Sequence, residues 1–146
     1  MATIEKTLNK EIMNTLSDEQ KVLFLKTLLF FSKVDGEVDE GEVKFIKKMA
    51  TKYKIEDIRK IFDPITEPEL LSQLKLLAKR RIALELIKEL FSLGHADSDL
   101  SDDEILFVGR VGQSLGIEVS KIEQISNWVI DYIVWKEQGK IIFEEE

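Results

Sequence analysis

The chain has 146 residues, of which 44% are hydrophobic and 34% are charged, a balance typical of a globular chain that buries a core. Its formal net charge is −7, so it lacks the basic footprint that nucleic-acid binding requires. It contains no cysteine, which excludes disulfides, thiolate zinc sites and cysteine nucleophiles. From this length we expect one domain, residues 1–146.

The spacing of apolar residues predicts an all-α bundle of about seven helices and no sustained strand. In chain order, the predicted helices cover roughly residues 4–13, 17–34, 39–53, 56–62, 66–91, 101–115 and 120–134. Four of the helix starts carry a capping box, in which two side chains satisfy free backbone N–H groups: Ser17–Gln20, Asp39–Glu42, Thr66–Glu69 and Ser101–Glu104. Gly116 suits the position just after a helix. We expect the tail, residues 138–146, to be frayed or to form a short docked strand after Gly139.

An acidic stretch occurs twice, at residues 35–42 and 97–104, with five acids in each eight-residue copy. Every position of the second copy follows the first at an offset of 62, and the flanking apolar residues match at the same offset, as in Phe45 and Phe107. A constant offset indicates an internal duplication. We therefore expect a pseudo-two-fold repeat of helix–acidic loop–helix units, with one copy at about 18–55 and the other at about 80–117.

Two interpretations of the acids remain open. In the first, they are only helix caps and first-turn charges that favour the helix dipole. In the second, carboxylates at loop positions 1, 3, 5 and 8 bind a divalent cation, with Ca²⁺ or Mg²⁺ preferred to Zn²⁺ or Mn²⁺. An EF-hand does not fit, because position 6 is Glu40 or Asp102 and position 12 is Ile46 or Val108. The candidate metal ligands are Asp35, Glu37, Asp39, Glu42, Asp97, Asp99 and Glu104.

The run from Phe31 to Glu42, with its second copy from Ala96 to Glu104, resembles the tellurite-resistance TerB family, a module also found in a membrane-anchored J-domain co-chaperone. The resemblance extends over about residues 17–135. It implies an all-helical bundle with a pseudo-two-fold axis and the same acidic metal site. It also implies a role in metal-ion sensing or stress resistance within a membrane-associated complex. The second copy differs in having Ser98 where the first has Gly36.

Two further features have more than one interpretation. His95, the only histidine, is either an exposed residue near a helix end or a nitrogen ligand beside the second acidic loop. Trp128, Tyr132 and Trp135 share one stripe of the last helix, which is either part of the core and its rim or a face for a protein or membrane.

No glycine-rich phosphate loop is present in the sequence, and a nucleophile–base pair has few candidates, so we expect a protein that is not an enzyme. Neither a signal peptide nor a transmembrane segment is evident, so we expect a cytoplasmic protein, or one that meets membranes only peripherally. Three functions follow: a cation-binding TerB-like module, an adaptor whose protein partner binds the tryptophan stripe, and a metal-dependent hydrolase that uses Glu42.

Overall fold

The computed structural model describes residues 8–36, 38, 40–97 and 100–144, with the side chains of residues 96 and 97 left out. Within these ranges the chain forms eight α-helices, one 3₁₀ helix and no strand, which confirms the all-α prediction. The elements are α2 (Lys10–Thr15), α3 (Asp18–Ser32), α4 (Glu40–Lys52), α5 (Arg59–Phe62), α6 (Glu67–Gln73), the 3₁₀ helix η1 (Leu74–Leu77), α7 (Arg80–Asp97), α8 (Asp102–Ser114) and α9 (Val119–Phe143).

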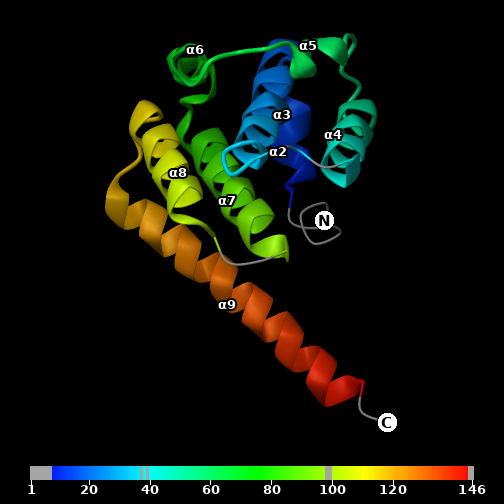
Figure 1. Ribbon diagram of the computed structural model, residues 1–146, viewed down its shortest axis with the longest axis vertical. Helices are drawn as coiled ribbons and strands as arrows, with labels where there is room; N and C mark the ends of the chain where they lie inside the picture. The colour runs from blue at the N-terminus through cyan, green and yellow to red at the C-terminus, as the bar shows by residue number, and fades with distance from the viewer. Residues whose placement is uncertain (1–7, 37, 39, 98–99, 145–146) are drawn as a thin grey trace.

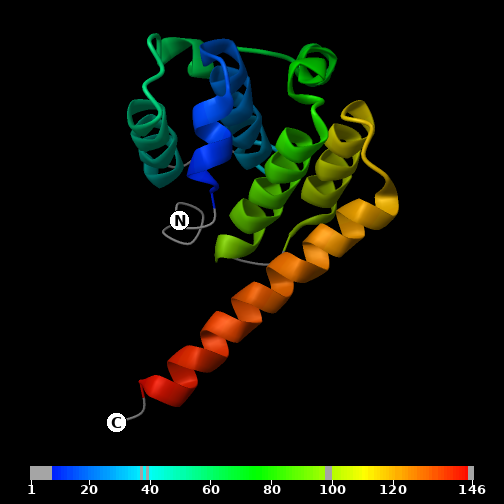
Figure 2. The same cartoon turned by 180° about the vertical axis from the view of Figure 1, so that it is seen from behind.

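Two helical hairpins form the body of the molecule. Helix α3 packs against α4, α7 packs against α8, and the hairpins meet where α3 lies against α7. Figures 1 and 2 show the resulting row of α8, α7, α3 and α4, seen from opposite sides. Helix α9 crosses the row, packs on α7 and α8, and then extends well beyond the bundle.

The core is assembled from the apolar faces of these helices. Phe24 and Phe31 of α3, Met49 of α4 and Phe107 of α8 are almost completely buried. The ring of Phe30 stacks on that of Phe107, with ring centroids 5.5 Å apart, so α3 also contacts α8. Burial of each large apolar side chain contributes about 1.5–3 kcal/mol to folding.

Three of the predicted capping boxes are confirmed by hydrogen bonds in both directions. The Gln20 N–H donates to Ser17 Oγ at 3.1 Å, and the Ser17 N–H donates to Gln20 Oε1 at 2.9 Å. The Thr66–Glu69 and Ser101–Glu104 boxes have the same reciprocal bonds. The fourth predicted box includes Asp39, which lies outside the described residues.

The long helix predicted over residues 66–91 is wrong. The chain instead forms α6, η1 and α7, with a break around Ala78 and Lys79. At 100° per residue, the buried leucines before the break point about 180° away from Leu86 and Leu90 of α7, so a straight helix would direct the two sets of leucines to opposite sides. The break buries both sets, and Gln20 Nε2 donates to the released Leu76 carbonyl at 2.8 Å.

The predicted end of the chain also differs from the structure. Helix α9 begins one residue before the predicted Ser120 and continues through Gly139 to Phe143, where we expected a frayed tail or a strand. The glycine at position 139 does not end the helix, because its backbone stays within the α-helical range of α9. Residues 141–143 are therefore displayed on a helix, and all three are exposed.

Candidate functional site

The first acidic loop is only partly described. Asp35 is exposed, directly before Gly36, whose φ of +153° is readily adopted only by glycine. Glu42 is half-buried in the first turn of α4. Glu37 and Asp39 lie outside the described residues, so the structure places two of the four predicted ligands in this loop.

In the second acidic loop, the predicted ligand whose side chain is described is Glu104. Its Oε1 accepts the Ser101 N–H at 2.9 Å, while Ser101 Oγ accepts the Glu104 N–H at 3.1 Å. Glu104 therefore contributes to capping α8, as the first interpretation of the acids requires. Asp97 is the last residue of α7 but its side chain is not described, and Asp99 lies outside the described residues.

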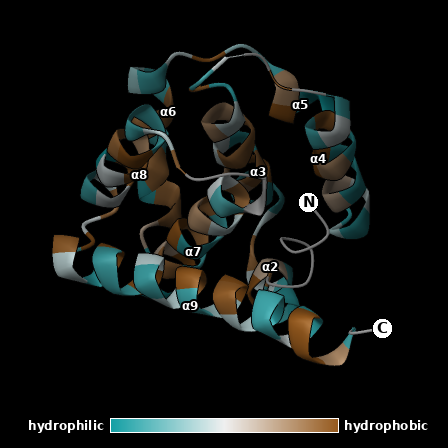
Figure 3. Cartoon of the chain, turned by 60° about the horizontal axis from the view of Figure 1, so that its bottom comes forward, coloured by the Kyte–Doolittle hydropathy of each residue, from teal (hydrophilic) through white to brown (hydrophobic). Residues whose placement is uncertain are grey.

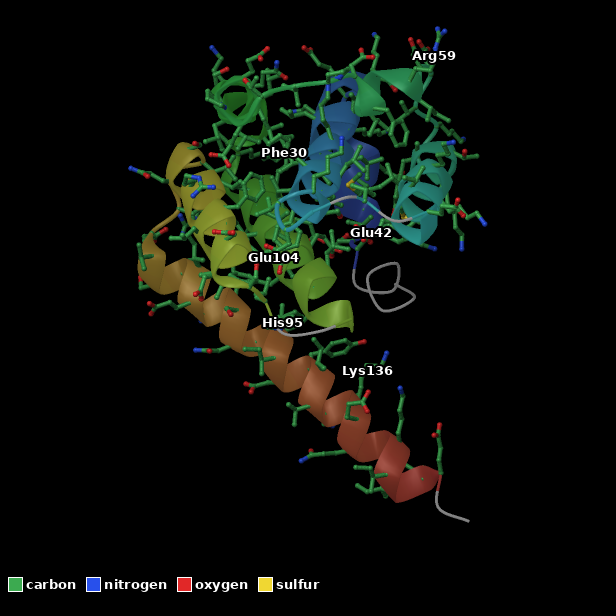
Figure 4. All side chains as sticks on the ribbon, in the orientation of Figure 1. Phe30, Glu42, Arg59, His95, Glu104 and Lys136 are labelled. Atoms are coloured by element: carbon green, nitrogen blue, oxygen red, sulfur yellow. The ribbon has the colours of Figure 1, made fainter. Side chains whose placement is uncertain are left out.

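Helices α3 and α7 end, and α4 and α8 begin, at the same end of the bundle, which is the end that α9 crosses (Figure 1). Glu42 and Glu104 nevertheless stand on α4 and α8, the outer helices of the row, with α3 and α7 between them (Figures 1 and 4). Among the side chains that the structure describes, no three histidine or acidic groups gather closely enough to hold a metal ion. The predicted ligand set thus has no assembled geometry in the described part of the chain.

His95 lies in the last turns of α7, where that helix approaches α9 (Figure 4). Its side chain is half-buried, and its Nε2 atom is shielded from solvent. It also lines an open groove between α8 and α9. The expected position near a helix end is confirmed, but His95 is half-buried rather than exposed, because α9 covers the end of α7.

Sequence reasoning missed a buried ionic cluster on α7. Glu85 and Glu89 are fully buried, and Lys88 lies within 2.7 Å of Glu85 Oε2 and 3.3 Å of Glu89 Oε1. Glu85 also accepts the backbone N–H of Asn9 at 3.0 Å, which ties the start of α2 to α7, and forms an ion pair with Arg81 at 3.2 Å. The available signal was the i, i+4 spacing of two glutamates on a helix that is apolar on nearly every other side.

An open groove of about 740 Å³ lies between α8 and α9. Its walls are mainly apolar and come from α7, the connection to α8, α8 itself and the first half of α9; they include Phe91, Leu100, Ile105, Ile122 and Ile130. Gly112 lets α9 approach α8 closely, since a Cβ at this position would collide with Ile122 Cδ1. Glu118 and Glu123 add acidic groups to the groove.

The main exposed apolar surface is on α9. Trp128 and Trp135 are 56% and 71% exposed, and the terminal residues Ile141, Ile142 and Phe143 are more than half exposed. Tyr132 is half-buried, and its ring stacks on Trp128 with a centroid separation of 6.3 Å. Figure 3 shows apolar residues along α9 up to its C-terminal end. Of the two interpretations of this stripe, the described tryptophans fit an outward-facing surface.

Comparison of the chain with family models, with curated proteins and with solved structures found no match. Within the described ranges, no helix combines the length and apolar character needed to span a bilayer. The geometry of the molecule therefore carries the functional argument.

Proposed function

We propose that this chain is a non-enzymatic protein-interaction module that binds its partner through α9. The observation that carries the proposal is the exposure of Trp128 and Trp135 on a helix that leaves the bundle. Aromatic residues, tryptophan above all, are enriched at the centres of protein interfaces. This is the adaptor function, in which acids such as Glu104 serve as helix caps.

The size of the exposed surface supports this proposal. Taking about 200 Å² for each aromatic side chain, Trp128 and Trp135 alone expose about 250 Å² at their observed exposures of 56% and 71%. The largest exposed apolar patch on a typical monomeric protein covers about 300–600 Å² and is often functional. The exposed aliphatic residues of the same helix add to this area.

The arrangement of the stripe also favours a protein partner. Trp128, Trp135 and Ile142 repeat every seven residues, so they lie on nearly the same side of α9. Lys136 Nζ lies 5.5 Å from the centre of the Tyr132 ring, which adds a cation to the edge of the stripe (Figure 4). A partner would bury the indole rings while their N–H groups find acceptors at the rim.

A pull-down with matched variants tests this proposal. Trp128→Ala/Trp135→Ala should lose the partner, whereas Asp35→Asn, which neutralises an exposed acid in the first loop, should retain it. All three positions are exposed, so both variants should keep the fold, and their circular dichroism spectra should match that of the unmodified protein. A partner that remains bound to the tryptophan variant but not to the Asp35 variant would contradict the proposal.

We also infer that the chain arose by duplication of a helical hairpin, as the resemblance to TerB proteins implies. Helices α4 and α8 are both 13 residues long, and their bounds differ by the offset of 62 found in the sequence. Buried positions match as well: Met49 and Val111 are both fully buried, as are Ala50 and Gly112. These correspondences support the repeat independently of the acidic residues.

Cation binding by the acidic loops stays a second proposal. Its support is that α3 and α7 end, and α4 and α8 begin, at the end of the bundle that α9 crosses, so the described parts of both acidic stretches lie toward that end. A cation there would relieve repulsion between carboxylates and stabilise the folded state by mass action. A role in tellurite or stress resistance rests on the resemblance alone.

A further inference from the structure

We propose that the groove between α8 and α9 binds the protruding end of α9 from a second copy of this chain. The resulting two-fold dimer goes beyond the partner binding assigned to Trp128 and Trp135, because it uses a different face of α9.

Two exposed faces of α9 can be distinguished. Val119, Ile130, Val134 and Ile141 lie on one side of the helix, at 100° per residue. The stripe of Trp128, Trp135 and Ile142 lies about 130° further around the helix. The first face lines the groove at Val119 and Ile130 and then continues beyond the bundle. Helix α9 thus forms one wall of the apolar groove and, further along the same face, carries the exposed apolar residues of the protruding segment.

The groove and the protruding segment have similar lengths. The groove extends along α9 from Val119 to Ile130, which is about 18 Å of helix. The segment from Val134 to Phe143 is about 15 Å long, and it contains exposed apolar residues with little contact to the bundle. If two α9 helices run antiparallel, each segment covers the groove of the other copy. The contact is then made twice and the assembly closes as a dimer.

Charge favours the same arrangement. Glu123 lines the groove, and Lys140 lies on the protruding segment. When the segment is centred on the groove, the two-fold axis passes beside Asp131 and Tyr132, and Glu123 lies level with Lys140 of the second copy. The present partner of Lys140 is Glu137, an exposed contact at 3.4 Å that is easily exchanged.

A membrane surface fits this face less well than a second copy does. The groove carries the acidic Glu123, which an anionic bilayer would repel. A second copy instead offers opposite charges at matching positions and buries the apolar face of both protruding segments.

Sedimentation equilibrium of the full chain tests the proposal, with a charge exchange as its central experiment. Glu123→Lys and Lys140→Glu should each raise the dimer dissociation constant about tenfold, because every substitution acts twice across the axis. The double variant Glu123→Lys/Lys140→Glu should restore it to near the wild-type value. All of these positions are exposed, so the variants should keep the fold.

A neighbouring pair of residues provides the control. Val134→Asp should abolish the dimer, whereas Trp135→Ala, on the other face, should leave its dissociation constant unchanged. A monomeric mass at concentrations up to about 1 mM would overturn the dimer, since weaker association has no plausible use in a cell. Failure of the double variant to recover dimerisation would overturn the antiparallel register. Loss of the dimer in Trp135→Ala would overturn the choice of face. Of these results, only loss of the dimer in Trp135→Ala bears on the tryptophan stripe; the others leave partner capture by that stripe untouched, so the two proposals fail separately.

Discussion

Lys54 and Gly116 adopt the same left-handed backbone conformation, with φ of +60° and +72°, 62 residues apart. Each ends a helix in the same way: the Ile55 N–H donates to the Ala50 carbonyl at 3.0 Å, and the Ile117 N–H donates to the Gly112 carbonyl at 2.9 Å. This closure is typical of a helix end and favours glycine at the left-handed position. A lysine there strains the backbone, because its Cβ crowds the neighbouring carbonyl.

The difference between lysine and glycine at these two positions should be measurable as a difference in stability. Lys54→Gly should stabilise the protein by about 0.5 kcal/mol, since relief of strain slightly exceeds the added entropy of the unfolded chain. Gly116→Ala should destabilise it by about 1 kcal/mol. Urea unfolding monitored by circular dichroism measures both values. A destabilised Lys54→Gly variant would mean that the lysine side chain contributes more than its backbone strain removes.

The ion pair between Arg80 and Glu118 leads to a prediction about acid stability. The two side chains form paired hydrogen bonds of 2.8 and 3.0 Å, which link the start of α7 to the residue before α9. The hydrogen bond from Arg80 lowers the pKa of Glu118 from its ordinary value of 4.5 to about 2. A lowered folded-state pKa stabilises the fold above pH 4.5, and this contribution disappears as the pH falls toward 2.

Carbon-detected NMR titration of the Glu118 carboxyl group should therefore give a midpoint near 2. In Arg80→Gln the midpoint should rise toward 4.5, and the loss of stability between these pH values should become shallower. An unchanged midpoint in this variant would show that Arg80 is not the cause of the shift.

The buried cluster on α7 predicts a large effect from one substitution. Lys88 is 16% exposed and lies between two fully buried glutamates, so Lys88→Met leaves Glu85 and Glu89 without their shared cation. Removing one member of a buried ion pair typically costs about 3–5 kcal/mol. Chemical denaturation should show a loss in this range, whereas Arg81→Met should cost less than about 1 kcal/mol because Arg81 is largely exposed. Equal losses in the two variants would contradict the central role of Lys88.

The cation proposal predicts saturable binding to chelator-treated protein. Calorimetric titration with Ca²⁺, Mg²⁺, Mn²⁺ and Zn²⁺ should detect at least one ion, and Asp35→Asn/Asp97→Asn should abolish its binding. At a concentration one hundred times the dissociation constant, the ion should stabilise the protein by about 2.7 kcal/mol. The control variant Glu56→Gln/Asp63→Asn removes the same charge elsewhere and should bind normally. Absence of binding by all four ions would remove the cation proposal.

Local features of the fold were predictable from the sequence, and features that depend on packing were not. The capping boxes at Ser17, Thr66 and Ser101 were found because the required residues lie within three positions of each other. The break after Leu77 was missed because no proline or glycine marks it. Its cause is the change in the direction of the buried leucines, which matters only once α6 and α7 pack on different neighbours.

In the candidate site, too, the local pattern was predictable from the sequence and the packing around it was not. The sequence placed Trp128 and Trp135 on one stripe, but periodicity cannot distinguish a buried stripe from an exposed one. The outcome depends on where α9 leaves the bundle, which tertiary contacts decide. Glu85 and Glu89 resembled surface residues for a related reason: α7 is covered by α3, α8 and α9, and a single helix pattern does not reveal three neighbours.

Site-specific photo-crosslinking in the producing cell is the most direct test of whether the tryptophan stripe of α9 is a protein-binding surface. A photoreactive phenylalanine analogue would replace Trp135, with a control at the exposed Lys75 on the 3₁₀ helix. We expect one dominant protein adduct at position 135 that is lost in the Trp128→Ala background, and no such adduct at position 75. Equal labelling at both positions, or no adduct at position 135, would contradict it.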